Sequence, residues 1–343
     1  MKMKKLALSI AVAAAMGGTA QAVVESEYSV GLLVPNVIHD GKGNTTGVGI
    51  ISRAKGTVYW TFFDRDSGHV TNGQFNVTKD DYHSFLWQNE AGTGLEAKDA
   101  NDPADPKRGY LIFLADVSSG TAPPACDNTK TDGLITRCDA ALNPIAGNAI
   151  QVIPPNDVAF VPSFPIAVVD LEDFPISPTT LGAGSVDYLV AGANCVRVGN
   201  SITGTIGTLT ESITGPYNDD IDMRYCIGGC AGGQASTRIA VWSAEMIKGT
   251  YTVNMFDDKQ NRKSVNFTLP NEELNFIDPA KIEGRPAGFE DGFIRWDVPC
   301  GFTDPRHTTQ APWNGVVTFS VISAPAFGAV QTIVNPFGAN VSP

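Results

Sequence analysis

The sequence predicts an all-β protein of two β-sandwich modules, Ig-like or jelly-roll-like, with long loops. Short runs of alternating apolar and polar residues recur along the chain, and this alternation is typical of strands with one buried face. The chain contains 35 glycines and 22 prolines, which separate these runs as turns. Strong helical periodicity is almost absent, so strands should account for most of the structure.

One strand pattern occurs twice, in residues 56–64 and again in residues 249–257. Both segments open with Gly-Thr and close with Phe-Asp at the same spacing. Successive side chains of a strand point to opposite faces, so the alternate apolar positions should face a core. These positions are Val58, Trp60 and Phe62 in the first segment and Tyr251, Val253 and Met255 in the second.

Two further matches follow in the same order. A pair of phenylalanines flanks an acidic turn in each half, Phe75 with Phe85 and Phe267 with Phe276. Residues 109–113 then match residues 292–296. Three ordered matches favour an internal duplication, with the extra residues of the first copy placed in a loop. The alternative is that any two antiparallel hairpins resemble each other.

The first residues have the features of a secretory signal peptide. Lysines precede an apolar run over residues 6–16, and Ala20 and Ala22 occupy the small-residue positions before a cleavage site. We expect residues 1–22 to be removed on export. The protein should then be extracellular, at the cell surface or periplasmic.

The mature chain divides by composition into three parts. Module 1 covers residues 23–170, a connecting segment covers 171–217, and module 2 covers 218–343 with an apolar C-terminal tail. The connecting segment contains the one expected helix, residues 185–193, with Ser185 as N-cap. The proline-containing tail from residue 324 is expected to reach a neighbouring subunit by strand addition.

Each module is expected to contain several short strands bounded by turn residues. In module 1 these are residues 23–37, 45–51, 56–64, 70–77, 110–117, 148–153, 158–161 and 166–170. In module 2 they are residues 238–242, 249–257, 264–269, 293–298 and 316–322.

The formal charge of the chain is −12, which excludes some partners. An acidic surface argues against nucleic acid and against anionic lipid. No apolar run after the signal is long enough to span a bilayer, so we expect no membrane span in the mature chain.

Six cysteines lie in the mature part, which in an exported chain indicates up to three disulfides. They are Cys126, Cys138, Cys195, Cys226, Cys230 and Cys300. Cys126 and Cys138 bracket a short loop and are expected to pair. Cys226 either closes on Cys230, or the two bond separately to Cys195 and Cys300.

The sequence contains none of the assembled motifs of a catalytic site. It lacks a Gly-x-Ser-x-Gly elbow, a His-Glu-x-x-His pair and a P-loop. Paired carboxylates occur in turn-like contexts, where acidic residues are expected for structural reasons. We therefore expect no enzyme and no firm cofactor, with a secreted hydrolase as the remaining catalytic alternative.

Asp64 and Asp66 approach Gly68 at alternate positions, a spacing that allows a calcium site. The acidic residue that closes an EF-hand loop is absent, because that position is Phe75. An ordinary acidic turn is the competing interpretation.

Three aromatic residues are candidates to face a ligand: Tyr59, Trp87 and Trp313. Trp87 and Trp313 lie beside polar turns, where an exposed ring could stack on a sugar. These features lead to the hypothesis of a structural or adhesive surface protein that associates with itself or with another surface protein. The alternative is a carbohydrate-binding protein with a glycan as ligand.

Overall fold

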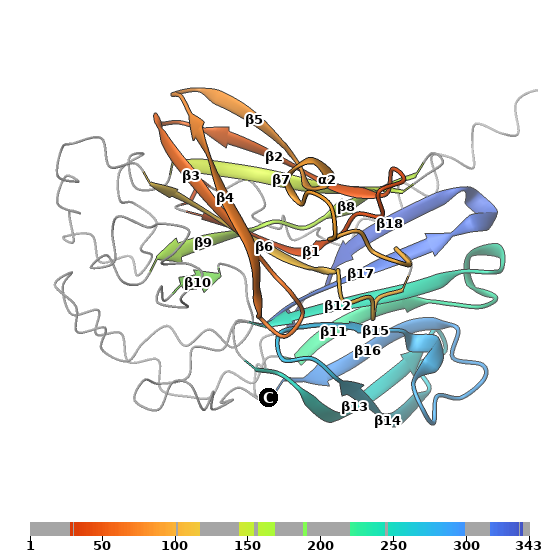
Figure 1. The fold of residues 1–343 in the computed structure, drawn as a ribbon. Helices are drawn as coiled ribbons and strands as arrows, with labels where there is room; N and C mark the ends of the chain where they lie inside the picture. The colour runs from red at the N-terminus through yellow and green to blue at the C-terminus, as the bar shows by residue number, and fades with distance from the viewer. Residues whose placement is uncertain are drawn as a thin grey trace, which may run out of the picture.

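The computed structural model describes residues 28–29, 31–100, 102–116, 144–153, 157–168, 188–190, 220–243, 246–298, 316–335 and 337–338. These residues form an all-β fold of four antiparallel sheets, which confirms the predicted fold class (Figure 1). No helix in these ranges is both long and apolar enough to cross a membrane.

The first sandwich consists of sheets A and B. Sheet A has the order β5-β2-β7-β8 and sheet B the order β10-β9-β1-β6-β3-β4. The strands are β1 (Gly31–Val37), β2 (Thr45–Ser52), β3 (Gly56–Phe63), β4 (His69–Val77), β5 (Asp81–Leu86), β6 (Gly109–Asp116), β7 (Ile145–Ile153), β8 (Asp157–Val161), β9 (Phe164–Val168) and β10 (Tyr188–Val190). The short helix α2 (Trp87–Glu90) follows β5.

The second sandwich consists of sheets C and D. Sheet C has the order β15-β12-β17-β18 and sheet D the order β14-β13-β16-β11-β19. The strands are β11 (Asp220–Cys226), β12 (Ser236–Ser243), β13 (Gly249–Asp257), β14 (Arg262–Leu269), β15 (Leu274–Ile277), β16 (Asp291–Asp297), β17 (Val316–Ala324), β18 (Ala329–Val334) and β19 (Phe337–Gly338). Three 3-10 turns accompany them, η1 (Cys230–Gly232), η2 (Pro279–Lys281) and η3 (Pro325–Phe327).

The two sandwiches have the same strand order. Adding ten to the number of each strand from β1 to β9 converts the pairings of the first sandwich into those of the second. The registers agree with the sequence matches: Phe62 lies opposite Leu111, and Met255 lies opposite Ile294. The shared topology supports the hypothesis of duplication, which stays a prediction about the origin of the chain.

One of the sequence matches does not hold at the level of side-chain direction. Phe85 is buried in the core of the first sandwich. Phe276 instead packs on the opposite face of its strand, among residues that join the two sandwiches. The two phenylalanines follow equivalent hairpins, but their side chains point to different sides of their sheets.

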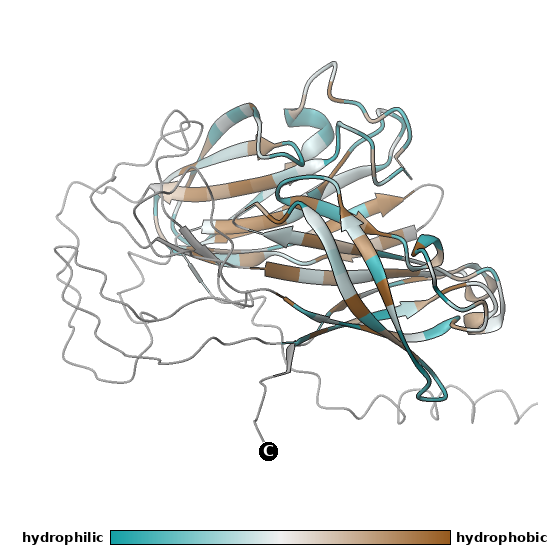
Figure 2. Cartoon of the chain, turned by 90° about the horizontal axis from the view of Figure 1, so that it is seen from below, coloured by the Kyte–Doolittle hydropathy of each residue, from teal (hydrophilic) through white to brown (hydrophobic). Residues whose placement is uncertain are grey.

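Three apolar layers join the four sheets in the order A, B, C, D, an arrangement called the stack below. Sheets A and C also meet at their edges, where β8 lies beside β18 and Thr332 Oγ1 donates a 2.6 Å hydrogen bond to the Phe160 carbonyl. Alternate residues fill successive layers because neighbouring side chains of a strand point in opposite directions. In β1, for example, Leu32 belongs to the A–B layer and Leu33 to the B–C layer. Figure 2 shows the resulting alternation of hydrophobic and hydrophilic residues along the strands.

The B–C layer joins the two sandwiches directly. On the sheet B side it contains Leu33, Tyr110, Ile112, Leu114, Phe164 and Ile166, and on the sheet C side Trp242, Leu274 and Val317. Glu273 adds a buried polar contact, since its Oε2 accepts a 2.7 Å hydrogen bond from the Tyr110 hydroxyl. The backbone N–H groups of Glu273 and Leu274 both donate to the Arg65 carbonyl, at 3.1 Å each.

A buried arginine lies near the same junction. Arg108 donates from Nη1 to Asn36 Oδ1 and from Nη2 to the Ala100 carbonyl, both at 2.7 Å. Its Cζ lies 5.0 Å from the ring centre of Phe276, a residue of the second sandwich. Burial, with the positive charge of Arg238 as a smaller cause, lowers the pKa of Arg108 to about 9. These contacts tie Arg108 to the packing of the stack.

Two expectations about the ends of the modules were wrong. Tyr188–Val190, inside the expected helix, forms strand β10 and pairs with β9. The tail is not free either, because Ala329–Val334 pairs with β17 as β18 and Phe337–Gly338 pairs with β11 as β19. The expected signal peptide over residues 1–22 lies outside the described residues.

Candidate interaction face

The outer face of sheet A carries mostly apolar side chains, three uncharged polar ones and no charged one. Its strands are short and alternate strictly, so every second residue points away from the A–B core. The outward residues are Tyr82, Ser84 and Leu86 in β5; Thr45, Gly47, Gly49 and Ile51 in β2; Ala146, Asn148, Ile150 and Val152 in β7; and Val158 and Phe160 in β8.

The exposed apolar residues of the described chain gather on this face. In the whole described part of the chain six large apolar side chains are exposed, and four of these six belong to sheet A. The four are Tyr82 with 65% of its surface exposed, Val158 with 54%, Ile51 with 44% and Ile150 with 40%. Contiguous exposed apolar surface on a folded protein is typical of an interaction site.

A glycine keeps the centre of the face flat. A Cβ atom added to Gly49 would stand 2.7 Å from the Tyr82 hydroxyl oxygen and 3.2 Å from Asn148 Oδ1. The Tyr82 side chain therefore lies across Gly49 towards β7. The cross-strand partner of Tyr82 is Ile51, so an aromatic and an aliphatic side chain stand together in the open.

The equivalent face of the second sandwich is covered. Strands β2 and β12 correspond to each other, and in both the residue before the final serine points outward. In β2 this residue is Ile51, which lies opposite Tyr82. In β12 it is Trp242, which lies opposite Leu274. Trp242 and Leu274 are fully buried because sheet B lies over them. The same cross-strand position is thus covered on sheet C and exposed on sheet A.

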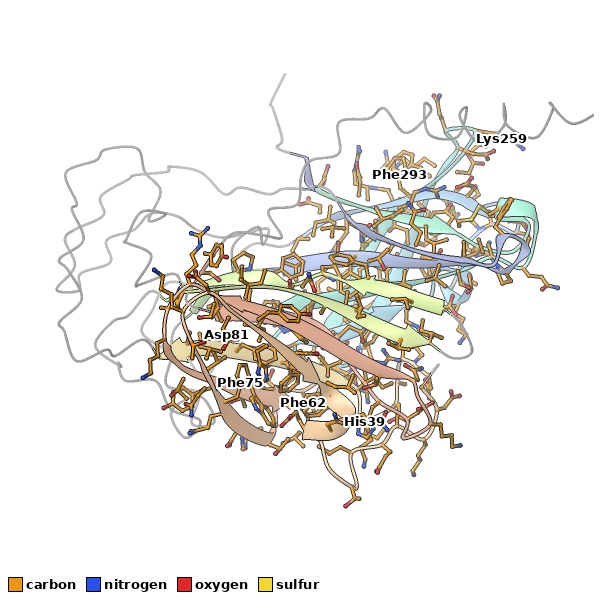
Figure 3. The ribbon with its side chains drawn as sticks, turned by 90° about the horizontal axis from the view of Figure 1, so that it is seen from above. His39, Phe62, Phe75, Asp81, Lys259 and Phe293 are labelled. Carbon is orange, nitrogen blue, oxygen red and sulfur yellow. A yellow bond between two sulfur atoms is a disulfide. The ribbon has the colours of Figure 1, made fainter. Side chains whose placement is uncertain are left out.

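The other end of the stack has a different surface. The outer face of sheet D carries Arg295, whose Nε and Nη2 both donate to the Asp222 carboxylate at 2.8 Å. Arg224 pairs with Asp291 on the same sheet. The Phe256 and Phe293 rings stack at 4.7 Å on this face, with the Arg295 guanidinium 5.4 Å from the Phe293 ring (Figure 3). The surface at this end of the stack is therefore charged.

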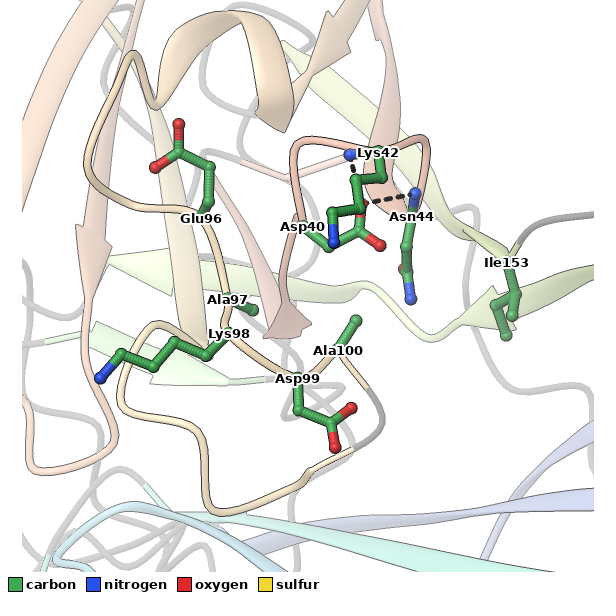
Figure 4. A pocket seen from close by; sticks show the side chains of 9 residues that line it. All are labelled: Asp40, Lys42, Asn44, Glu96, Ala97, Lys98, Asp99, Ala100 and Ile153. Atoms are coloured by element: carbon green, nitrogen blue, oxygen red, sulfur yellow. Dashed lines mark hydrogen bonds between the residues drawn. The ribbon is translucent and has the colours of Figure 1, made fainter.

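An open polar pocket lies at one end of the first sandwich, with a volume of about 590 Å³ (Figure 4). Its acidic side chains already serve the surrounding loops. Asp40 Oδ1 accepts from the Lys42 and Asn44 backbone N–H groups at 2.7 and 3.0 Å. Glu96 Oε2 accepts from the Gly94 N–H at 2.7 Å. Two of the three carboxylates that line the pocket, Asp40 and Glu96, therefore hold loop backbone in place.

Four carboxylates of the described chain, Asp81, Glu96, Asp105 and Asp257, have a pKa below the ordinary value. Backbone N–H donors are the main cause for Asp81 and Glu96, and the Asn261 side chain is the main cause for Asp257. For Asp105 burial acts upward, but N–H groups of Lys107, Asp99 and Lys98 outweigh it. A glycosidase general acid needs the opposite shift.

His39 (labelled in Figure 3) precedes the pocket residue Asp40 and is buried next to Trp87, with 6.4 Å between ring centres. Neither ring nitrogen has a hydrogen-bond partner within the described part of the chain. Burial lowers the pKa of His39 below its ordinary 6.5, although the nearby Glu96 and Asp40 charges act in the opposite direction. The folded protein therefore holds a neutral imidazole.

This burial predicts a loss of stability on mild acidification. Below pH 6.5 the unfolded chain binds a proton at His39 that the fold excludes, so the free energy of unfolding should fall as pH falls towards the lowered pKa. Urea unfolding of His39→Phe should show a flatter dependence from pH 7 to about 5 than the unchanged protein. The pKa of His83 is also lowered mainly by burial, so part of the pH dependence of the free energy of unfolding should remain in His39→Phe. Equal slopes for both proteins would contradict this role.

Asp64, a candidate calcium ligand, organises the β3–β4 turn. Its Oδ1 accepts from the Asp66 and Gly68 backbone N–H groups at 2.9 and 2.8 Å. Asp257 does the same in the β13–β14 turn, accepting from Lys259 and Asn261 at 2.9 and 2.7 Å.

Asp66, the second candidate ligand, makes a contact between the sandwiches. Its Oδ1 accepts from the Glu272 backbone N–H at 3.0 Å. Among the described residues, no group of three or more His, Cys, Asp or Glu side chains is arranged to hold a metal. Calcium binding at Asp64 and Asp66 stays a prediction.

Of the candidate ligand-facing aromatics, Trp87 lies inside the protein and Tyr59 is partly covered. Trp87 is fully buried, since it packs 4.4 Å from the Phe62 ring and 6.0 Å from the Trp60 ring. Tyr59 is half-buried against the B–C layer, where sheet C limits its exposure. The expected exposure of Trp87 was therefore wrong, and a ligand-facing role of Tyr59 stays a prediction. Trp313 lies outside the described residues.

The cysteine expectations are settled in part. Cys226 and Cys230 form a disulfide that links the end of β11 to the start of η1, which selects the local closure over bonds to Cys195 and Cys300. Cys126, Cys138, Cys195 and Cys300 lie outside the described residues.

No family model matches the chain, and neither does any curated protein or solved structure. The class of protein is therefore defined by its own architecture. It is an all-β stack of two sandwiches with a charged face at one end and an uncharged apolar face at the other.

Proposed function

We propose that this protein is an exported structural or adhesive component of the cell surface that works by contact and not by catalysis. The observation that carries the proposal is the uncharged apolar outer face of sheet A. Such a face is costly to leave in water and favours a macromolecular partner.

The joined sandwiches support the same function. The B–C layer and the Glu273 hydrogen bonds link the two halves, so the stack can transmit a force or fix a spacing without a flexible hinge. The export expected from residues 1–22 would bring this stack to a surface. Adhesive and structural roles need joined domains and a contact surface, and the B–C layer and the outer face of sheet A support such roles.

Surface labelling of the native cells tests the proposal. An antibody raised against the exposed β13–β14 turn around Lys259 should stain intact cells or an extracellular layer. Cells lacking the protein should lose that layer or their attachment, and an otherwise intact stack should restore it. Staining only after permeabilisation, or an unaltered surface in the deletion, would contradict the proposal.

A carbohydrate-binding protein is the second candidate, and Tyr82 is the observation in its favour. The Tyr82 ring is exposed on the sheet face, next to Gly49 and the Asn148 amide. An aromatic ring beside a hydrogen-bonding amide can hold a sugar ring. A glycan array compared between the unchanged protein and Tyr82→Ala tests this candidate, which fails if neither binds.

A further inference from the structure

We propose that the outer face of sheet A binds the same face of a second copy, forming a two-fold symmetric dimer in which sheet packs on sheet. The inference deepens the proposed function, since it names the partner and the surface. It rests on three features of the stack. These are the covering of the equivalent face of sheet C by a sheet, the poor fit of sheet D on sheet A, and the absence of charged side chains from the outer face of sheet A.

The first feature is the covering of sheet C. Trp242 and Leu274, at the positions equivalent to Ile51 and Tyr82, are buried by a sheet and not by loops or helices. Sheet-on-sheet packing is therefore the way in which this fold covers such a face. On sheet A no further sheet of the described chain is available, because sheet B already occupies the inner side.

The second feature is the identity of the covering surface. Sheet C is covered by sheet B, so repeating that contact between molecules would place sheet D of one copy on sheet A of another. The registers show why this does not fit. Ile112 of sheet B corresponds to Arg295 of sheet D, since each lies one residue beyond the matched pairs of β6 and β16. Arg295 and its Asp222 partner would lose water against an apolar face.

The third feature is charge. The chain carries a formal charge of −12, so two copies repel over most of their surfaces. The outward positions of β2, β5, β7 and β8 carry no ionisable side chain except the Tyr82 phenol. Two copies can meet there without burying like charges. A face that is apolar, uncharged and flat is complementary to itself, as a two-fold interface requires.

Sedimentation equilibrium of the protein, purified in the form that cells export, tests the dimer. The unchanged protein should be dimeric at micromolar concentration. The double variant Ile51→Glu with Ile150→Glu should raise the dissociation constant about a hundredfold or more, because the dimer would bury four carboxylates without partners. Val70→Glu is the matched control, since Val70 is similarly exposed on β4 but outside the face. It should leave the dimer intact.

Cross-linking separates the two packing modes. Asn148→Cys, near the centre of sheet A, should give a covalent dimer with a short bismaleimide. Asn266→Cys, on the outer side of β14, should not. Circular dichroism of each variant confirms that the sandwiches are folded. A monomer at all concentrations up to about 1 mM would overturn the proposal, and so would a dimer that persists in the double glutamate variant.

Two further outcomes would also overturn the dimer. Linking through Asn266→Cys would indicate a contact between the sheet D faces of two copies, and a monomer that binds glycans through Tyr82 would favour the carbohydrate candidate. The result is independent of the surface-labelling experiment. A dimer that does not reach the surface contradicts only the proposed function, and a monomer at the surface contradicts only the dimer.

Discussion

A chain that ends after Ala324 should fail to fold its second sandwich. The cut removes β18, which pairs with β17 over six residue pairs, and β19, which covers the free edge of β11. It also removes Asn335, a buried residue that binds both neighbouring strands. Asn335 donates to Thr318 Oγ1 at 3.1 Å and accepts from Ser320 Oγ at 2.9 Å and from the Arg224 N–H at 3.2 Å.

The loss should amount to a large part of the stability of an ordinary domain. Thr318 and Ser320 would remain buried without their partner, at about 1–3 kcal/mol each. The apolar layer under β18 would also be exposed. Since the total stability of a domain is about 5–15 kcal/mol, these losses should unfold sheets C and D together.

Limited proteolysis with trypsin measures this outcome. The truncated chain should be cleaved rapidly at Lys263 and Arg262 in β14, sites that the ordered hairpin protects in the unchanged protein. A chain ending after Gly338 is the matched control, because it keeps both strands and should resist cleavage. Equal resistance of the two truncated chains would show that β18 and β19 are dispensable.

The tail shows why the sequence could not distinguish a free segment from a paired one. Residues 329–334 alternate as a strand should and form β18, although from the sequence they were expected only as part of an apolar tail. The partner of that strand depends on tertiary structure, which a local pattern does not contain. The helix predicted over residues 185–193, which includes β10, was wrong for a related reason. Ser185 and the following residues suit a helix start, yet pairing with β9 decides the conformation of Tyr188–Val190.

Periodicity was a reliable guide wherever one face of a strand is buried. The matched segments 56–64 and 249–257 became β3 and β13, with Trp60 and Val253 in the cores that the pattern predicted. A strand with two apolar faces gives a weaker signal. Ile50 and Ile51 are adjacent and apolar, as are Ala149 and Ile150. Since neighbouring side chains of a strand point in opposite directions, each pair places one apolar side chain on each face of sheet A. That signal was present in the sequence and could have identified the outer face of sheet A.

The same reasoning explains the error at Trp87. Polar neighbours in residues 88–90 suggested exposure, but Phe85 and Trp87 are two positions apart and so share a direction at the end of β5. The structure places Trp87 at the first position of α2, where it closes the A–B core against three aromatic rings.

Replacing this side chain should therefore have a large effect on stability. Trp87→Ala removes a fully buried indole and leaves a cavity between Phe62 and Trp60, so the free energy of unfolding should fall by about 3–5 kcal/mol. Trp87→Phe should cost much less, because it keeps a ring in place and removes an indole Nε1 that has no partner within the described chain. Urea unfolding monitored by circular dichroism gives both values.

Tyr82→Ala is the control that separates core packing from surface packing. Tyr82 lies five residues earlier on β5 with 65% of its surface exposed, so its removal should change the stability of the monomer by only about 0.5 kcal/mol. A loss at Tyr82 comparable to that at Trp87 would mean that the outer face of sheet A is covered within the chain itself. That result would contradict the proposal that this face is an interaction surface, because a face covered by its own chain is not accessible to a second copy.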